Sequence, residues 1–514
     1  MPEATSDRVA KHLQRIEAAD QGRPRRRVTI IGAGMAGLVA AHELERLGHT
    51  VRVFEASRET KGRVRTHRFA DGSYGEMGAM RIPINHDYTR HYVNKLGLEL
   101  RKFVTSHENL SCFYDIRGVR TRMRDAPERL YGEFDLSIQQ REDPIPPKML
   151  ARAVSDVIEG LTDDERASLR TGDLETDRVR EVDRMTMGEF LRVRAGTEGA
   201  ELIGAATGLE QMYDRCATML LRDAVAAVGD HLDEIVGGMD LLPTGLAGTI
   251  KGEIVTRAPV RAICPRGDGS VELVVERDGT RVTEQCDVVL CTMPFSVLRT
   301  LDVSPAFSPQ KMYAIRNLGY ESSTKVLLHC TRRFWELDDG IAGGASQTDT
   351  LARAIYYPSD NARAVTDSHP SQARFNTMYG GYVDGDFEPA SREVSEGPGV
   401  LLGSYTWGMD GRRIGQLPPD ERADVIKRLV ARLHPQVLEA GVVDEHASFF
   451  WDQYPWANGS FCELEPGQQA TLHNDVKRPE AGVHFAGEHT SLDTGWIQGA
   501  VSSAFRAVEE IVTG

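Results

Sequence analysis

The chain has 514 residues, of which 40% are hydrophobic and 27% charged, a composition typical of a globular protein with about three domains' worth of sequence. Its 61 Lys and Arg residues against 76 Asp and Glu give a net charge of −15, which argues against nucleic acid as a partner because phosphate contacts need a cationic face. Seven cysteines without a Cys-x-x-Cys pair predict reduced thiols and no metal site. No apolar run approaches the roughly 18 residues of a membrane span, so we expect a cytoplasmic protein without membrane contact.

The clearest pattern of secondary structure lies near the N-terminus. A charged helix is expected over residues 6–19. Residues 28–31 then predict a buried parallel strand, 35–47 a helix and 50–55 a second strand. This order is typical of a βαβ unit that binds a nucleotide.

The rest of the chain alternates between helical and strand-rich stretches. Helices are expected over residues 130–139, 148–161 and 187–195, as a helical insertion. Strands are expected at residues 254–255, 260–264, 271–275, 286–291, 325–329, 400–405 and 483–486. A last helix over 495–512 follows the last strand, so the strand-then-helix pattern of a phosphate site recurs at the C-terminal end. We therefore expect a discontinuous cofactor domain with inserted segments.

Residues 32–37 form a Gly-x-Gly-x-x-Gly motif between the first strand and the first helix. Gly32 permits the tight turn, Gly34 lets backbone amides approach a pyrophosphate, and Gly37 allows the helix to pack on the strand. Glu55, at the end of the second strand, is placed to accept hydrogen bonds from ribose hydroxyls. The motif therefore predicts a dinucleotide site, and the acid favours FAD or NAD over NADP.

Two further segments favour FAD. Arg63, after Gly62, is placed to cap the pyrophosphate from the side opposite the helix, although it could be a solvated loop residue. Near the C-terminus, Gly487-Glu488 and the Gly495-Trp496-Ile497 turn predict a second part of the FAD site, which binds phosphate and the ribityl chain. There Glu488 would hold a ribityl hydroxyl. A nicotinamide enzyme needs no such distant closing segment.

Together with Gly78-Ala79-Met80-Arg81 and the Gly-Gly-Met-Asp segment at 237–240, these motifs resemble the flavin amine oxidase superfamily. Within it the chain most resembles L-amino-acid oxidases of the snake-venom and bacterial type, from about residue 27 to 508. The resemblance implies an α/β fold with a discontinuous Rossmann-like FAD-binding domain, a mixed-sheet substrate domain and a helical insertion. The implied ranges are 24–66, 232–320 and 447–514 for FAD binding, 1–23, 67–122 and 321–446 for substrate binding, and 123–231 for the helical domain.

The resemblance also implies roles for residues of the site. Arg81 would pair with the substrate α-carboxylate as a planar fork, or else neutralise flavin phosphates. Tyr405 would share that carboxylate, or be a core tyrosine. Lys325 would contact flavin N5 through water as the catalytic lysine, or reach solvent at a strand edge. Gly495 and Trp496 would line the pocket near the substrate amine, or else Trp496 would be a packing residue.

The resemblance implies this set of cofactor-binding residues: Gly32, Gly34, Met35, Ala36, Gly37, Glu55, Ala56, Gly62, Arg63, Gly78, Ala79, Met80, Arg81, Val260, Gly487, Glu488, Trp496 and Ile497.

The sequence departs from the superfamily at two places. Phe461 stands where monoamine oxidases attach the flavin to a cysteine, and Cys462 follows one residue later, so non-covalent FAD is expected. Arg222 falls where the snake-venom enzymes place a pocket histidine. It would favour acidic or polar substrates if it points into the pocket, and would be a solvated helix residue if it points outward. Alternatively, three tryptophans could line an aromatic pocket: Trp407, Trp451 and Trp456.

The expected reaction is FAD-dependent oxidative deamination of an L-amino acid. Hydride transfer from Cα to flavin N5 gives an imino acid, which hydrolyses to the 2-oxo acid and ammonia, and dioxygen is reduced to hydrogen peroxide. The alternatives are an amino-acid 2-monooxygenase, a monoamine or polyamine oxidase, and a non-catalytic flavoprotein. By analogy with the family, a homodimer or higher homo-oligomer is expected.

Overall fold

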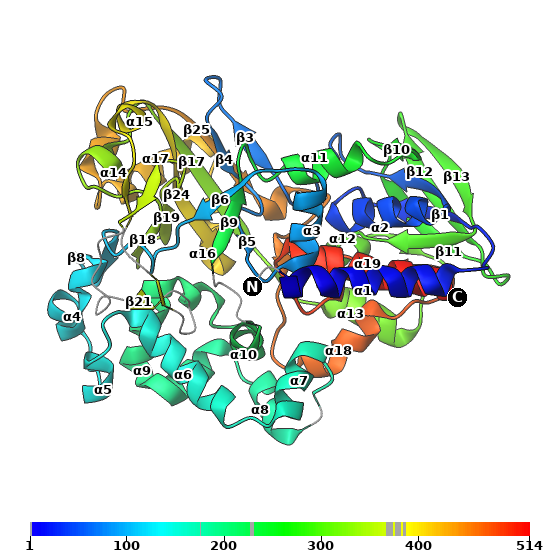
Figure 1. Ribbon diagram of the computed structural model, residues 1–514, viewed down its shortest axis with the longest axis horizontal. Helices are drawn as coiled ribbons and strands as arrows, with labels where there is room; N and C mark the ends of the chain where they lie inside the picture. Colours follow the sequence, from blue (N-terminus) through cyan, green and yellow to red (C-terminus); the bar gives the residue numbers. More distant parts are fainter. Residues whose placement is uncertain (1–2, 175, 227–230, 366–373, 376–381, 384–386) are drawn as a thin grey trace.

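The computed structural model describes residues 3–174, 176–226, 231–365, 374–375, 382–383 and 387–514 (Figure 1). A five-stranded parallel sheet lies at its centre, in the order β10-β2-β1-β14-β27. Its strands are β1 (Arg27–Ile31), β2 (Thr50–Phe54), β10 (Glu253–Val255), β14 (Val288–Cys291) and β27 (Val483–Phe485). The sheet therefore joins segments from both ends and the middle of the chain, as expected of a discontinuous cofactor domain.

Successive strand residues of this sheet point to opposite faces, as the pleat requires. On one face, Val28 and Ile30 pack with helices α2 (Met35–Arg46) and α19 (Ile497–Thr513). Helix α1 (Glu3–Asp20) lies along α19, and Arg15 pairs with Glu509 at 2.6 Å (Figure 1). The first and last helices of the chain therefore lie side by side.

On the other face, Ile31 and Val289 pack against a four-stranded sheet of order β13-β12-β11-β15. Its strands are β11 (Val260–Pro265), β12 (Val271–Arg277), β13 (Thr280–Cys286) and β15 (Asp302–Val303). Helices α12 (Phe295–Leu298), α13 (Pro309–Asn317) and α18 (Gln468–Lys477) complete this layer.

A second large sheet has seven strands of mixed direction, in the order β25-β17-β24-β19-β18-β7-β8. Its strands are β7 (Phe113–Ile116), β8 (Val119–Arg122), β17 (Ser323–Cys330), β18 (Ala345–Thr348), β19 (Ala354–Tyr356), β24 (Gly399–Trp407) and β25 (Val443–Phe450). Every residue of β17 is buried, because β24 and β25 flank it on both edges. A three-stranded sheet has the order β5-β9-β6, with β5 (Ile82–Pro83), β6 (Leu100–Phe103) and β9 (Leu232–Ile235).

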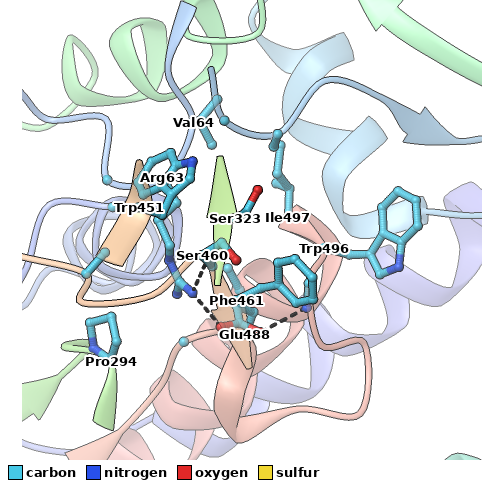
Figure 2. A pocket seen from close by; sticks show the side chains of 18 of the residues that line it. Arg63, Val64, Pro294, Ser323, Trp451, Ser460, Phe461, Glu488, Trp496 and Ile497 are labelled. Atoms are coloured by element: carbon cyan, nitrogen blue, oxygen red, sulfur yellow. Dashed lines mark hydrogen bonds and ion pairs between the residues drawn. The ribbon is translucent and has the colours of Figure 1, made fainter. Parts of the chain in front are cut away.

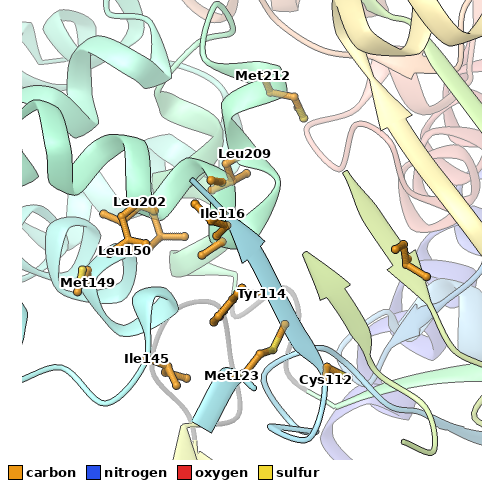
Figure 3. Packing of buried hydrophobic residues seen from close by; sticks show 14 of the residues in the cluster. Cys112, Tyr114, Ile116, Met123, Ile145, Met149, Leu150, Leu202, Leu209 and Met212 are labelled. Atoms are coloured by element: carbon orange, nitrogen blue, oxygen red, sulfur yellow. The ribbon is translucent and has the colours of Figure 1, made fainter. Parts of the chain in front are cut away.

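The helical segment packs on the far edge of the mixed sheet. Tyr114 and Ile116 of β7 lie in one apolar cluster with Leu150 and Leu202 (Figure 3). These last two belong to α6 (Pro146–Glu159) and α9 (Met187–Thr207); the neighbouring helices are α7 (Asp163–Thr171), α8 (Asp177–Arg184) and α10 (Thr218–Val225). This shared core fixes α10 close to the sheet that carries the site.

The helix expected over residues 130–139 is wrong. The structure has short turns instead: α4 (Ala126–Arg129), a 3₁₀ turn Tyr131–Glu133 and α5 (Ile138–Arg141). Phe134 is extended and buried, and Ser137 starts α5 with a capping box, so a continuous helix is broken there. The helix expected over 187–195 continues to Thr207 across a kink at Gly196.

The remaining elements connect these layers. They are β3 (Thr66–Arg68), β4 (Tyr74–Glu76), α3 (Asp87–Lys95), α11 (Leu241–Ala247), β16 (Tyr320–Glu321), α14 (Phe334–Leu337), β20 (Ala362–Ala364), β21 (Arg374–Phe375), β22 (Tyr382–Val383), β23 (Phe387–Pro389), α15 (Arg392–Glu396), α16 (Gly408–Gly415), α17 (Pro419–Val430) and β26 (Phe461–Cys462).

The division into three domains stays a prediction. Strand β9, from the range expected to bind FAD, pairs with β5 and β6 from the range expected to bind substrate, so these two ranges share a sheet. Within the described residues, no helix is both long and apolar enough to cross a membrane.

Candidate active site

A cavity of about 720 Å³ lies where the parallel sheet, the mixed sheet and the helical segment meet. Residues that directly follow four parallel strands line it: Gly32 after β1, Glu55 after β2, Thr292 after β14, and Gly487 near the end of β27. Ligands of open α/β sheets bind at this carboxyl edge. The volume falls within the roughly 300–1,000 Å³ of small-molecule and cofactor pockets.

The glycine motif shapes one end of the cavity. Gly34 and Gly62 approach so closely that a Cβ on Gly62 would lie 3.0 Å from the Cα of Gly34. A Cβ on Gly37 would lie 1.9 Å from the backbone oxygen of Gly32, so this glycine serves helix–strand packing and is not on the cavity wall. The bare backbone at the start of α2 leaves room for a pyrophosphate beside its amides.

Glu55 is fixed by the backbone on both carboxylate oxygens. Its Oε2 accepts from the amide of Ala33 and its Oε1 from the amide of Ser57, each at 2.7 Å. A carboxylate has about four acceptor positions, so lone pairs remain for ribose hydroxyls in the cavity that Glu55 lines.

Arg63 and Glu488 meet at the cavity wall (Figure 2). The guanidinium donates to the Glu488 carboxylate at 2.6 Å and to the backbone oxygen of Ser460 at 3.2 Å. Glu488 also accepts from the amides of Cys462, at 3.1 Å, and Gly495, at 2.9 Å. This acid therefore ties β26 and the turn before α19 to the Arg63 loop.

Phe461 lines the cavity, whereas Cys462 is fully buried and off its wall (Figure 2). Burial also raises the pKa of the Cys462 thiol well above its usual value. Both observations agree with non-covalent FAD, which stays a prediction.

Arg81 has a distinctive position among the arginines of the cavity. Its guanidinium lies 5.7 Å from the centroid of Trp496, in cation–π range. Across the described parts of the chain, no carboxylate lies within 4 Å of it. Arg63, by contrast, is neutralised by Glu488.

Tyr405 and Lys325 lie side by side on β24 and β17. Lys325 Nζ lies 4.3 Å from the Tyr405 ring centroid and donates to the Gly78 backbone oxygen at 2.7 Å. Lys325 is 1% exposed, so it does not reach solvent at a strand edge. Burial lowers its pKa, with the Glu76 charge opposing and the Arg81 charge adding to that shift. Burial raises the pKa of Tyr405, and Arg81 opposes that rise.

All but two of the residues expected in the site lie on the cavity wall. The exceptions are Gly37, explained above, and Arg222. Arg222 lies behind the wall, where it donates to Gln469 at 3.2 Å, and its neighbour Asp223 faces the cavity instead. A helix turns about 100° per residue, so the two side chains point in different directions. Arg222 is 6% exposed, so it neither enters the pocket nor reaches solvent as expected. The three tryptophans expected near the pocket all line it: Trp407, Trp451 and Trp456.

Sequence reasoning missed several charged or titratable groups at the cavity. Glu76 lies behind the wall, where burial raises its pKa to about 8 and the Lys325 charge opposes that rise. Burial lowers the pKa of His107, on the wall near Arg81, to about 4. Asp223 and Glu463 also line the wall. None belongs to a spaced motif. Only the position of the three acids, one or two residues from Arg222, Phe461 and Gly78, could have indicated them.

The described residues contain no group of three or more His, Cys, Asp or Glu side chains that could hold a metal ion.

Comparisons with known proteins agree with this geometry. The family described as flavin containing amine oxidoreductase matches residues 35–512. A flavin-dependent L-tryptophan oxidase from Lentzea aerocolonigenes is 37% identical, over 96% of this chain and 99% of that protein. An L-amino-acid oxidase from Siganus canaliculatus is 30% identical, over 94% of this chain and 85% of that protein.

Solved structures share the fold. Wild-type putrescine oxidase bound to putrescine aligns with a TM-score of 0.71 at 18% identity, covering 96% of this chain and 100% of that chain. Cyclohexylamine oxidase from Brevibacterium oxydans aligns with a TM-score of 0.70 at 18% identity, covering 95% and 99%. With the family match across nearly the whole sequence and a cavity built to hold a dinucleotide, the chain belongs to the flavin-containing amine oxidoreductases, and its cofactor is FAD.

Proposed function

We propose that the protein oxidises an L-α-amino acid to the 2-oxo acid, ammonia and hydrogen peroxide. The observation that carries the proposal is the guanidinium of Arg81, which lines the cavity without a protein carboxylate as partner within the described residues. A partly buried cation of this kind gains most from an anionic ligand, and a planar fork fits a carboxylate. An amine substrate offers no group that Arg81 could bind.

The residues around Arg81 orient a substrate held by its carboxylate. Tyr405 presents a hydroxyl from the neighbouring strand, and its low acidity keeps that hydroxyl a hydrogen-bond donor. Trp496 and Phe461 enclose the cavity on either side of Gly495. Bound FAD supplies the hydride acceptor and passes the electrons to dioxygen. Orientation of the Cα–H bond is therefore the main contribution of the protein itself.

Lys325 completes the machinery. Its ammonium is held by the Gly78 backbone oxygen, and its lowered pKa allows it to give up or take a proton near neutral pH. We infer that it positions a water molecule and handles a proton beside the reacting atoms.

The named relatives support an amino acid as substrate, since the two sequences described above are an L-tryptophan oxidase and an L-amino-acid oxidase. The structural neighbours act on amines according to their names, but at 18% identity they share the fold alone. The amino-acid 2-monooxygenase alternative uses the same binding groups and is separated by its products.

The test is an anaerobic titration of the purified holoenzyme with a panel of L-amino acids, D-amino acids and primary amines, followed by flavin absorbance. Bleaching by L-amino acids alone supports the proposal, and equal bleaching by the corresponding amines contradicts it. In air, ammonia and peroxide in equal amounts indicate the oxidase, whereas carbon dioxide and an amide indicate the monooxygenase.

A further inference from the structure

Two carboxyl groups from distant segments line the cavity in addition to the expected site residues. Asp223 comes from α10 of the helical segment, and Glu463 directly follows β26. Phe461, two residues before Glu463, is part of the same wall. The cavity that holds the unpaired Arg81 guanidinium therefore also presents two acids.

Glu463 is buried without a protein partner. Its side chain belongs to a residue that is 2% exposed, and its Oε1 makes no hydrogen bond to any described residue. Desolvating a carboxylate without a partner is costly, so such groups usually pair with a cation or a donor. Among the described residues none gives this carboxyl a hydrogen bond or an ion pair within 4 Å, which points to a ligand.

The nearby arginines do not neutralise this pair. Arg222 donates to Gln469, its Nε has no acceptor, and no ion pair within 4 Å joins it to Asp223 or Glu463 in the described structure. Arg215 is engaged by Glu321 at 2.7 Å. The Arg222 charge is also shared among four carboxyl groups whose pKa it lowers: Asp183, Asp223, Glu463 and Asp493. This side of the cavity thus carries an excess of acid.

Aromatic rings stand beside the two acids. Trp407 and Phe461 both line the cavity, with ring centroids 6.5 Å apart and planes at 90°. Aromatic faces attract cations and pack well against the methylene groups of lysine or arginine side chains. The wall therefore combines the two surfaces that a long cationic side chain needs.

We infer that Asp223 and Glu463 form a subsite for the positively charged side chain of an L-amino acid, of the arginine or lysine type, whose carboxylate Arg81 binds. This inference rests on the proposed function, because it takes Arg81 as the anchor of the same substrate. It reverses the preference for acidic substrates that Arg222 would have given.

The acids respond to pH in a way that fits this role. Burial raises the pKa of Glu463 to about 8, with Arg222 opposing and Asp223 adding to the rise. Burial raises the pKa of Asp223 to about 7, with Arg222 opposing and Asp493 adding. A bound cation stabilises the ionised carboxylates. Affinity for a cationic side chain therefore increases as pH rises from 6 to 9, relative to a neutral side chain of the same shape.

The experiment compares kcat/KM for L-arginine with that for L-citrulline, its neutral isostere, and L-lysine with L-norleucine. The enzymes are wild-type holoenzyme, Asp223→Asn, Glu463→Gln and the double variant. The control is Glu465→Gln, whose side chain is half exposed and off the cavity wall. We expect the wild-type enzyme to favour each cationic substrate about tenfold or more, and Glu463→Gln to reduce that preference by about tenfold. The values for citrulline and norleucine should change little, as should every value in Glu465→Gln.

Equal use of arginine and citrulline by the wild-type enzyme overturns the inference. An equal loss for all substrates in Asp223→Asn and Glu463→Gln also overturns it, because the acids would then serve the α-amino group or the fold. Flavin content and thermal unfolding of each variant identify a folding defect. Agmatine, which is arginine without its carboxylate, separates the two proposals. If agmatine is oxidised as fast as L-arginine while the acids still select the guanidinium, the amino-acid oxidase proposal fails and the subsite stands.

Discussion

The guanidinium of Arg63 and the carboxylate of Glu488 lie 2.6 Å apart although 425 positions separate them in the chain. Both side chains are largely buried, with 22% and 7% exposure. Glu488 also accepts the amides of Cys462 and Gly495. One ion pair therefore joins the loop after β2 to the two C-terminal segments that close the cavity.

Replacing Glu488 with Gln should release flavin and destabilise the protein. The variant leaves the Arg63 charge without a counter-ion in a buried site, a change that costs roughly 3–5 kcal/mol. The measurements are the flavin-to-protein absorbance ratio after desalting and the free energy of unfolding. Asp287→Asn is the control, because its pair with Arg27 is exposed to solvent and should contribute little to stability. Equal effects of the two variants would contradict this account.

Replacing Gly62 with Ala should weaken flavin binding. Gly62 has φ +55°, which costs an L-residue about 1–2 kcal/mol, and the new Cβ would lie 3.0 Å from the Cα of Gly34. Gly97→Ala matches the backbone cost, with φ +64° and open space around the new Cβ. We expect both variants to lose stability and Gly62→Ala alone to lose FAD affinity, measured by titration of the apoprotein. Unchanged FAD affinity in Gly62→Ala would show that the cradle tolerates a methyl group.

Replacing Arg81 with Met should abolish the distinction between amino acids and amines. Loss of the charge pair with the substrate carboxylate removes about 2–5 kcal/mol of stabilisation, which lowers kcat/KM for the amino acid roughly 30- to several thousand-fold. The corresponding decarboxylated amine should be used equally by both enzymes. Steady-state kinetics with an L-amino acid and its amine provides the test, and a parallel loss for the amine would place Arg81 at the flavin phosphates instead.

His329 should make stability depend on pH. It bridges two acids, with Nε2 at 3.0 Å from Asp71 and Nδ1 bonded to Asp444. Burial lowers the pKa of His329, but these two carboxylates outweigh burial and raise it above 6.5. The stabilisation is thus complete below pH 6.5 and disappears as pH rises through the higher folded-state value. The melting temperature of His329→Gln should fall furthest below wild type at acidic pH, and the difference should shrink as pH rises. A constant difference across pH would rule out this role.

The parallel core of the fold was predictable because neighbouring residues in the sequence determine its turns and strands. The Gly32–Gly37 motif, with apolar strands on both sides, predicts the first βαβ unit, and Gly487 follows the apolar strand expected at 483–486. The boundaries near residue 134 could not be predicted, because Phe134 is held in extended form by burial in a core built from distant helices and strands.

The site was predictable where a motif fixes the side chain and not where a helix face decides. Arg81 and Lys325 lie on the cavity as expected, since loop and strand positions set their direction. Arg222 was expected in the pocket, but Asp223 lines it instead, because a shift of one residue along a helix turns a side chain from the wall to the space behind it. The role of Glu463 could not be predicted, because it depends on which distant segments pack around the carboxyl. In the described structure none of them donates a hydrogen bond to its Oε1.

The chain order of the central sheet has a consequence for biosynthesis. The β1-α2-β2 unit ends at Phe54, whereas β27 begins only at Val483 and Glu488 follows it. A nascent polypeptide on the ribosome therefore carries half of a nucleotide cradle whose closing acid has not yet been translated. Long-range parallel pairing of this kind is slow and exposes sheet edges in the meantime. Flavin capture through Glu488 therefore requires that the chain from β1 to β27 has been made.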